Sequence, residues 1–156
     1  MPAKQRQIKD AIATYLAGIT IAGGYFTNLN ATGQVLDQTT SYRNMTVFPA
    51  VQVRYGVQEK NHVTYGDRRT NSVSSFDLLL AGATENVLAD VAADVEKRLV
   101  TPDGAGGFLG LTGIVDIEEI TVTGTEPAEV AEEIGRGIRW WVLTLTVSYL
   151  HLRGTA

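Results

Sequence analysis

Cysteine is absent from this chain of 156 residues. Its absence excludes disulfide bonds, thiolate metal sites and a cysteine nucleophile, and it makes the fold indifferent to the redox state of its compartment. Histidine is nearly as scarce, with two residues. His62 and His151 form no HExxH or HxH motif, so the sequence places no second metal ligand beside either of them. We therefore expect neither a metal nor a cofactor.

Long hydrophobic runs and an excess of basic charge are also missing. No stretch approaches the roughly 18 apolar residues of a membrane span, and the charged N-terminal segment lacks the apolar core of a secretory signal. We expect a protein that folds in a cytoplasm and has no membrane partner. The 13 basic and 17 acidic residues give a formal charge of −4. Because phosphate binding needs a basic face, specific binding of nucleic acid is not expected.

The motifs of common enzymes are missing as well. The glycine-rich segment 101–113 contains no Gly-Lys-Ser/Thr, and it follows a predicted helix, whereas a dinucleotide fingerprint follows a strand. No serine stands in a GxSxG context. The glutamates of 124–137 form a run that is typical of a solvated surface rather than a pair of carboxylates in a cleft. These absences predict that the protein is not an enzyme.

Two segments have the apolar periodicity of amphipathic helices. Residues 4–18 and 84–100 each place apolar side chains on one stripe. Thr84 is a good N-cap for the second segment, and its last turn is basic, as the helix dipole favours. The predicted buried stripe of the first helix consists of Ile8, Ile12, Tyr15, Leu16 and Ile19, with Lys4, Arg6, Lys9 and Asp10 on its other faces.

Alternating apolar and polar residues predict strands over 48–57, 72–81 and 138–152. The first two are joined by the polar excursion 58–71, which suggests a hairpin with a projecting arm. The last could span roughly 50 Å, more than the diameter of about 40 Å expected for a domain of this size. We therefore expect it either to bend or to overhang, and an overhanging strand has an edge free to pair with a neighbouring chain.

Weaker signals place short strands at 25–29 and 33–37 and an irregular strand at 114–123. No internal repeat or linker is present, so we expect one domain over 1–156. The order of elements predicts an α+β fold, with two helices packed on one face of a mostly antiparallel sheet and a projecting hairpin or loop arm.

Two charged segments are candidates for contacts with partners. A basic, partly aromatic patch lies in 58–71 and consists of Lys60, His62, Tyr65, Arg68 and Arg69. An acidic connection spans 124–137 and carries Glu126, Glu129, Glu132 and Glu133. A solvated surface is the more common explanation of such charged segments. A cyclic ring, however, needs two different complementary patches on each subunit, and these two segments could form such a pair.

The adjacent residues Trp140 and Trp141 must point to opposite sides of a strand. We expect Trp141 in the core. Trp140 must then be covered by something else or remain partly exposed, and exposed aromatic residues concentrate at interfaces. Trp140 is therefore a further candidate interface residue.

The order of the segments resembles the tail-terminator, or minor tail protein U, type of siphophage tail completion protein. The resemblance is carried by QIKDAIATYLAGIT, FPAVQVRYG, ENVLADVAADVEKRLV and WWVLTLTVSYLHLRG, and it covers nearly the whole chain. It implies a ring, usually a hexamer, that sits on the last ring of the major tail protein at the head-proximal end of the virion tail. Such a ring ends tube growth and provides the surface for head-completion or connector proteins, with the genome passing through it.

Two other functions remain open on the sequence. A head–tail connector subunit of the phage neck is similar in size and also forms rings. A small-molecule-binding α+β module would need a concave apolar pocket with convergent polar groups, of which the sequence shows no sign.

Overall fold

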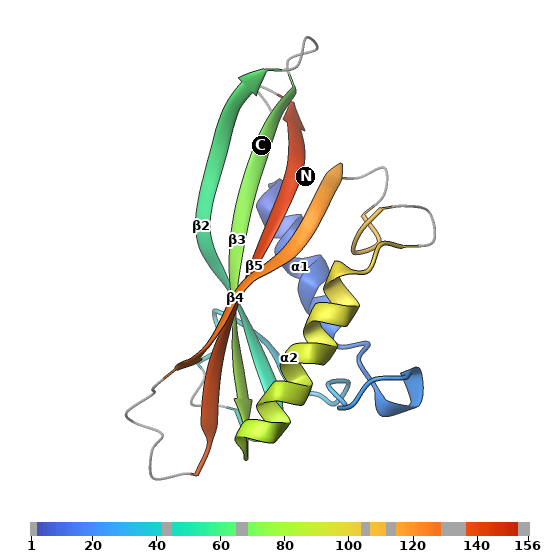
Figure 1. Ribbon diagram of the computed structural model, residues 1–156, viewed down its shortest axis with the longest axis vertical. Coiled ribbons are helices and arrows are strands. Elements are labelled where there is room, and N and C mark those ends of the chain that lie inside the picture. The colour runs from blue at the N-terminus through green and yellow to red at the C-terminus, as the bar shows by residue number, and fades with distance from the viewer. Residues whose placement is uncertain are drawn as a thin grey trace.

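The computed structural model describes residues 3–41, 45–64, 69–103, 107–111, 115–128 and 137–152. Two α-helices and a five-stranded mixed sheet form an α+β fold, which confirms the expected class (Figure 1). The elements in chain order are α1 (Lys4–Leu16), the 3-10 helix η1 (Ile21–Gly23), β1 (Val35–Asp37), β2 (Ala50–Thr64), β3 (Arg69–Gly82), α2 (Glu85–Val100), β4 (Ile117–Ala128) and β5 (Arg139–Leu152).

Helix α1 buries the predicted stripe, since Ile8, Ile12 and Leu16 are fully buried. Lys9, which was expected outside the apolar stripe, is nevertheless buried. Its ammonium group lies against β1, where it donates to both carboxylate oxygens of Asp37 at 3.0 and 3.2 Å. Burial of Lys9 is possible because its charge is paired and its aliphatic stem covers apolar surface.

Helix α2 begins and ends as the sequence predicts. The Thr84 hydroxyl accepts a hydrogen bond from the backbone N–H of Val87 at 3.2 Å, which caps the first turn. The first helical residue, Glu85, accepts a hydrogen bond of 2.6 Å from the indole N–H of Trp141. This contact ties the start of the helix to β5.

The strand order in the sheet is β1-β2-β3-β5-β4. Only β1 pairs in parallel, with β2, and the other three pairings are antiparallel. The β2–β3 hairpin is confirmed, but the excursion 58–71 is mostly strand rather than turn. Polar residues such as Gln58 and Glu59 still pair with β3. An antiparallel strand can expose one face to solvent, so it does not need many apolar side chains.

The predicted strand 25–29 is not formed. Here the backbone N–H groups of Phe26 and Thr27 donate to the carboxylate of Asp94 on α2, at 2.8 to 3.1 Å, rather than to a neighbouring strand. The second of the short strands is present as β1, which pairs with β2 instead of with 25–29. The backbone of this segment therefore bonds to a buried carboxylate of α2 instead of forming the expected hairpin with 33–37.

Strand β4 is irregular, as predicted, with register shifts between Ile117 and Glu119 and between Val122 and Gly124. It continues to Ala128, so the first part of the acidic connection belongs to the sheet. Residues 129–136 lie outside the described part of the chain.

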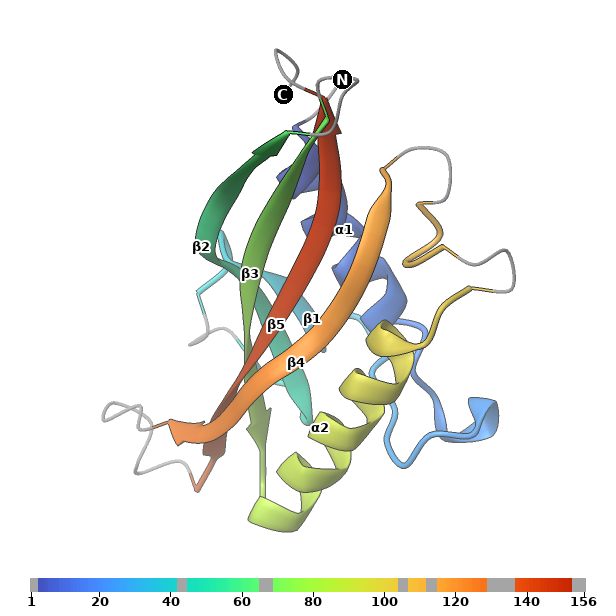
Figure 2. The ribbon, with the colours of Figure 1, turned by 45° about the horizontal axis from the view of Figure 1, so that its top comes forward.

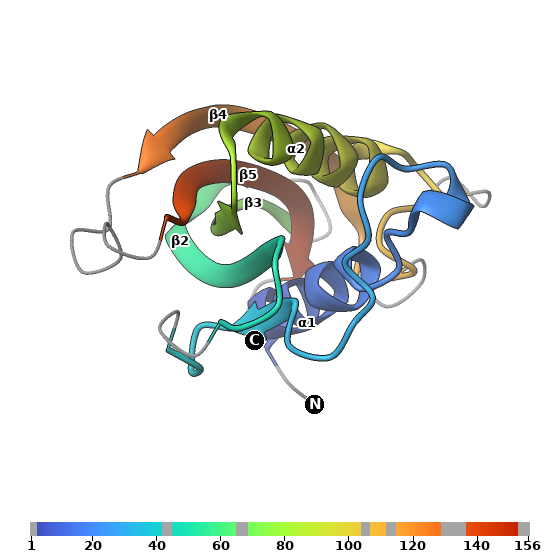
Figure 3. The same cartoon turned by 90° about the horizontal axis from the view of Figure 1, so that it is seen from below.

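The expectation that 138–152 has a free edge is wrong. β5 lies inside the sheet and pairs with β3 along its whole length and with β4 from Trp140 to Tyr149. The long strands fit a domain of this size because the sheet twists and curls, as the view from below shows (Figure 3). The bending alternative is thus confirmed.

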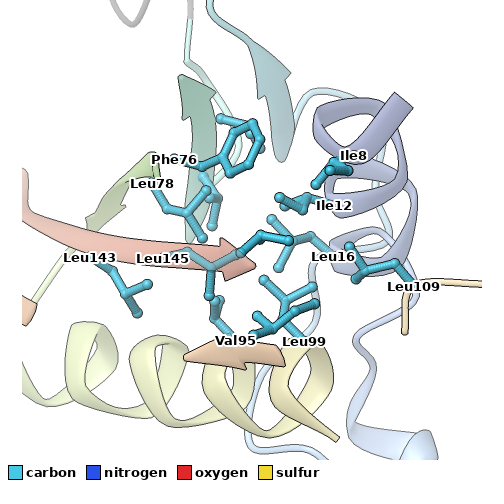
Figure 4. Packing of buried hydrophobic residues seen from close by; sticks show 14 of the residues in the cluster. Ile8, Ile12, Leu16, Phe76, Leu78, Val95, Leu99, Leu109, Leu143 and Leu145 are labelled. Atoms are coloured by element: carbon cyan, nitrogen blue, oxygen red, sulfur yellow. The ribbon is translucent and has the colours of Figure 1, made fainter. Parts of the chain in front are cut away.

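The main core lies between the helices and one face of the sheet (Figure 4). Phe76, Leu78, Leu143 and Leu145 of the sheet meet the apolar stripes of α1 and α2 there. A second, smaller cluster covers the opposite face near one end of the sheet and consists of Met45, Ala50, Leu79, Ala81 and Trp140.

Candidate assembly interface

The basic candidate residues lie on the long β2–β3 hairpin. The backbones of Lys60 and His62 belong to β2, and Arg69 is the first residue of β3. Lys60 pairs with Ser72 in the register of the hairpin. Tyr65 and Arg68 lie outside the described residues.

Of the acidic candidates, Glu126 is exposed on β4, paired with Val142 of β5. Glu129, Glu132 and Glu133 lie outside the described residues. Because β3 and β5 separate β2 from β4, the fold does not bring Glu126 and the basic hairpin together within one chain. A contact between Glu126 and this hairpin would therefore have to join different chains.

Trp140 is 5% exposed. Residues of its own chain cover the ring, among them the buried Met45 and Leu79. The interpretation of Trp140 as a partly exposed aromatic residue is therefore wrong, since the segment before β2 folds over this face of the sheet. Trp141 was expected in the core, but it is only partly buried and packs against the main core.

One margin of the sheet is left open along β2. β1 covers β2 only from Val51 to Val53. The side-chain oxygen of Gln38 then accepts a hydrogen bond of 2.8 Å from the backbone N–H of Tyr55. From Gly56 to Thr64, no strand among the described residues lies along this side of β2. We call this segment the β2 edge.

The start of the β2 edge is apolar and exposed. The side chain of Val57 is 65% exposed and that of Tyr55 is 37% exposed. The pairing with β3 shifts register between Tyr55 and Gln58, and the Gln58 side-chain amide donates to the carbonyls of Gly56 and Ser75 at this irregularity. The exposed Val57 thus lies on a strand margin that has no described strand partner, and such a margin can pair with another chain.

The other margin of the sheet is formed by β4 (Figure 2). Its exposed side chains include Glu118, Glu119 and Glu126, and the segment Ile117–Ala128 contains no basic residue. We call this segment the β4 edge. Acidic side chains, a register shift and Pro127 are features that keep an edge strand from pairing indiscriminately.

A third exposed surface lies on the loop that follows α1. Phe26 is 70% exposed and Ile21 is 58% exposed. The loop is held by Asp94, which also accepts from the Thr27 hydroxyl at 2.6 Å, and by Asn28, which accepts from the Ile21 backbone N–H at 2.7 Å. The role of Asp94 was not predicted, because an acidic residue in the middle of a helix usually faces solvent.

A hollow of about 200 Å³ lies between the ends of α1 and α2. The Arg98 guanidinium stacks over the ring of Tyr15, 4.7 Å from its centroid, and donates to the Tyr15 carbonyl. The Tyr15 hydroxyl donates to Asp103 at 2.8 Å, and burial together with this bond raises the pKa of Tyr15. Asp103 also accepts from the backbone N–H of Gly110. The polar groups of this hollow thus hold the loop after α2 in place.

The described residues contain no group of three or more acidic or histidine side chains that could hold a metal ion. None of the described helices is long and apolar enough to cross a membrane.

A comparison with solved structures shows a structural similarity. No family model matches the chain, and no curated protein sequence matches it. A solved structure described as the virion of a native gene transfer agent (GTA) particle contains a chain of similar fold, with a TM-score of 0.59 and 13% sequence identity. The match covers 92% of this chain and 94% of that chain. At this identity the similarity shows a shared fold.

Proposed function

We propose that this protein is a structural subunit of a phage-like tail that assembles into a ring of the tail-terminator type. In this role the ring, hexameric in the terminator class, caps the tail tube, ends tube polymerisation and presents a surface to the head-completion protein. The proposal does not involve catalysis.

The observation that carries the proposal is the fold shared with a chain of a phage-like virion over nearly the full length of both proteins. The shape of the molecule adds support. Among the described residues, the β2 edge and the β4 edge lie at opposite margins of the sheet and have no strand partner on their outer sides. A ring requires two different contact surfaces per subunit, and a sheet open at both margins provides them.

Imaging tests the proposal and separates it from the neck-connector alternative. The purified protein is mixed with isolated tail tubes and, separately, with heads that carry an exposed portal, and each mixture is examined by negative-stain electron microscopy. Rings bound at one end of the tubes would support the terminator role. Binding to the portal end of heads alone would assign the protein to the connector class, and binding to neither would contradict the proposal.

A further inference from the structure

The two open margins of the sheet have compatible strand directions. β2 and β3, β3 and β5, and β5 and β4 are all antiparallel pairs, so β4 runs opposite to β2 (Figure 2). If neighbouring copies are related by rotation about an axis roughly parallel to the strands, each β2 edge faces a β4 edge that runs antiparallel to it. Two such strands can pair directly, without any change in the orientation of the sheet.

The β2 edge is long for an exposed strand margin. From Gly56 to Thr64 it offers about 30 Å of backbone at about 3.3 Å per residue. Exposed edges in natural proteins are commonly short, charged, bulged or interrupted by proline; the β2 edge has two charged residues and two register shifts, but it is long and contains no proline. Its start carries the 65% exposed Val57, which an additional strand would cover.

We propose that the β2 edge pairs, as an antiparallel strand, with the β4 edge of a second copy of this chain, so that the sheet continues from subunit to subunit. This inference rests on the proposed ring and states which backbone contact closes it. The distribution of charge permits this choice of partner. The β4 edge carries Glu118, Glu119 and Glu126 without a basic residue, whereas the β2 edge carries one glutamate, Glu59, and one lysine, Lys60, and so has no excess of acidic charge.

Pairing of identical edges is less favourable. Two β4 edges would bring their glutamates together, and like charges opposite each other destabilise a sheet. Two β2 edges would form a closed dimer that leaves both β4 edges open. Only the β2–β4 contact is heterologous, and only a heterologous contact propagates around a ring.

The natural absence of cysteine makes disulfide cross-linking a clean test. Val57→Cys is combined in turn with Glu119→Cys, Thr121→Cys, Thr123→Cys or Glu126→Cys, which sample successive registers along β4. A disulfide forms only where Cα atoms lie about 4.4–6.8 Å apart, which is the spacing of paired strands. Each variant is concentrated, oxidised mildly and run on a denaturing gel without reductant. The controls are the single-cysteine variants and Val57→Cys combined with Asp90→Cys, which is exposed on α2.

We expect at least one β2–β4 pair to give a ladder that extends beyond the dimer, while the controls stay monomeric. A dimer from Val57→Cys alone would mean that two β2 edges pair, and it would overturn the inference. A second experiment covers the case in which none of the chosen cysteine pairs matches the true register. Val57→Lys should reduce the ring population at least tenfold at fixed concentration, whereas Val57→Thr should leave it unchanged. Equal melting temperatures of the two variants would show that both are folded.

Failure of this inference is distinguishable from failure of the proposed function. If the protein caps tubes but no pair cross-links and Val57→Lys assembles normally, the ring is closed by another surface and only the edge pairing is wrong. If the ladder forms but tubes are not capped, the edge pairing holds and the terminator role is wrong.

Discussion

The Asp94 carboxylate is 1% exposed in the middle of α2, and it organises a segment far away in sequence. Its two oxygens accept hydrogen bonds from the backbone N–H groups of Phe26 and Thr27 and from the Thr27 hydroxyl. Bonds from N–H groups to a carboxylate are stronger than those between neutral groups. This one side chain therefore fixes the loop on which Phe26 and Ile21 are exposed.

Replacing Asp94 by asparagine should destabilise the protein by about 2 kcal/mol, because an amide group cannot accept all of these bonds and leaves buried donors unpaired. The measurement is the midpoint of urea unfolding. Asp90→Asn, at an exposed position on the same helix, is the matched control and should stay within about 0.5 kcal/mol of the wild type. Equal midpoints for Asp94→Asn and Asp90→Asn would contradict the assigned role.

The pair formed by Lys9 and Asp37 predicts a dependence of stability on pH. The hydrogen bond from the Lys9 ammonium lowers the pKa of Asp37 below its usual value of 3.8. A carboxyl whose pKa is lower in the folded state stabilises the fold above pH 3.8, and this contribution is lost as the pH falls through the folded-state pKa. The side chain of Asp37 is 46% exposed, so solvent screens part of the effect.

Asp37→Asn should therefore lower the free energy of unfolding by about 1 kcal/mol or less at pH 7. The difference from the wild type should shrink below pH 3.8. Unfolding curves at pH 7 and in acid measure both effects. Asp10→Asn, which removes the exposed ion pair with Arg6, should change little at either pH. A difference for Asp37→Asn that persists unchanged in acid would exclude the ion pair as its cause.

At the scale of elements, the start and the end of α2 are both marked in its own sequence, by the Thr84 N-cap and by the basic last turn. Thr84→Ala removes the bond to the Val87 N–H and should cost about 1 kcal/mol, whereas Thr84→Ser keeps a hydroxyl and should cost much less. Thermal unfolding of the two variants measures the difference. Equal losses would mean that packing of the threonine methyl group, rather than the cap, stabilises this end.

Helices and strands that are encoded by a pattern within one segment were predicted correctly. Features that depend on a contact with a residue far away in the sequence were not. The apolar stripe of α1, the cap of α2 and the alternation in β5 follow from spacing within one segment. The loss of a strand at 25–29 depends on Asp94, and the burial of Lys9 depends on Asp37. No periodicity within either segment encodes these contacts, because they form only when the chain is folded.

The candidate interface was predictable only in part for the same reason. Charge patterning drew attention to the hairpin and to the glutamates that follow it in sequence. Which strands form the margins depends on the order β1-β2-β3-β5-β4, and this order is set by pairings between segments far apart in the chain. The sequence suggested β5 as the strand with a free edge, whereas the open margins belong to β2 and β4.

At the scale of the whole molecule, the described part of the chain forms a curled sheet with helices on one face, and no described strand pairs with the outer side of β4 or, beyond Val53, with that of β2 (Figures 1 and 3). A subunit of this kind is suited to repeat around an axis, as the proposed ring requires. A ring built in this way needs no catalytic residues, only surfaces held in a fixed geometry.

Growth of tail tubes in the presence of the protein tests the central claim most directly. Purified tube protein is allowed to polymerise alone, with the wild-type chain, and with Val57→Lys as the matched variant, and tube lengths are measured by electron microscopy. The account predicts that the wild-type chain stops elongation at substoichiometric amounts and leaves a ring at one tube end, whereas Val57→Lys does so far less efficiently. Tubes that elongate equally with and without the wild-type chain would contradict the terminator role.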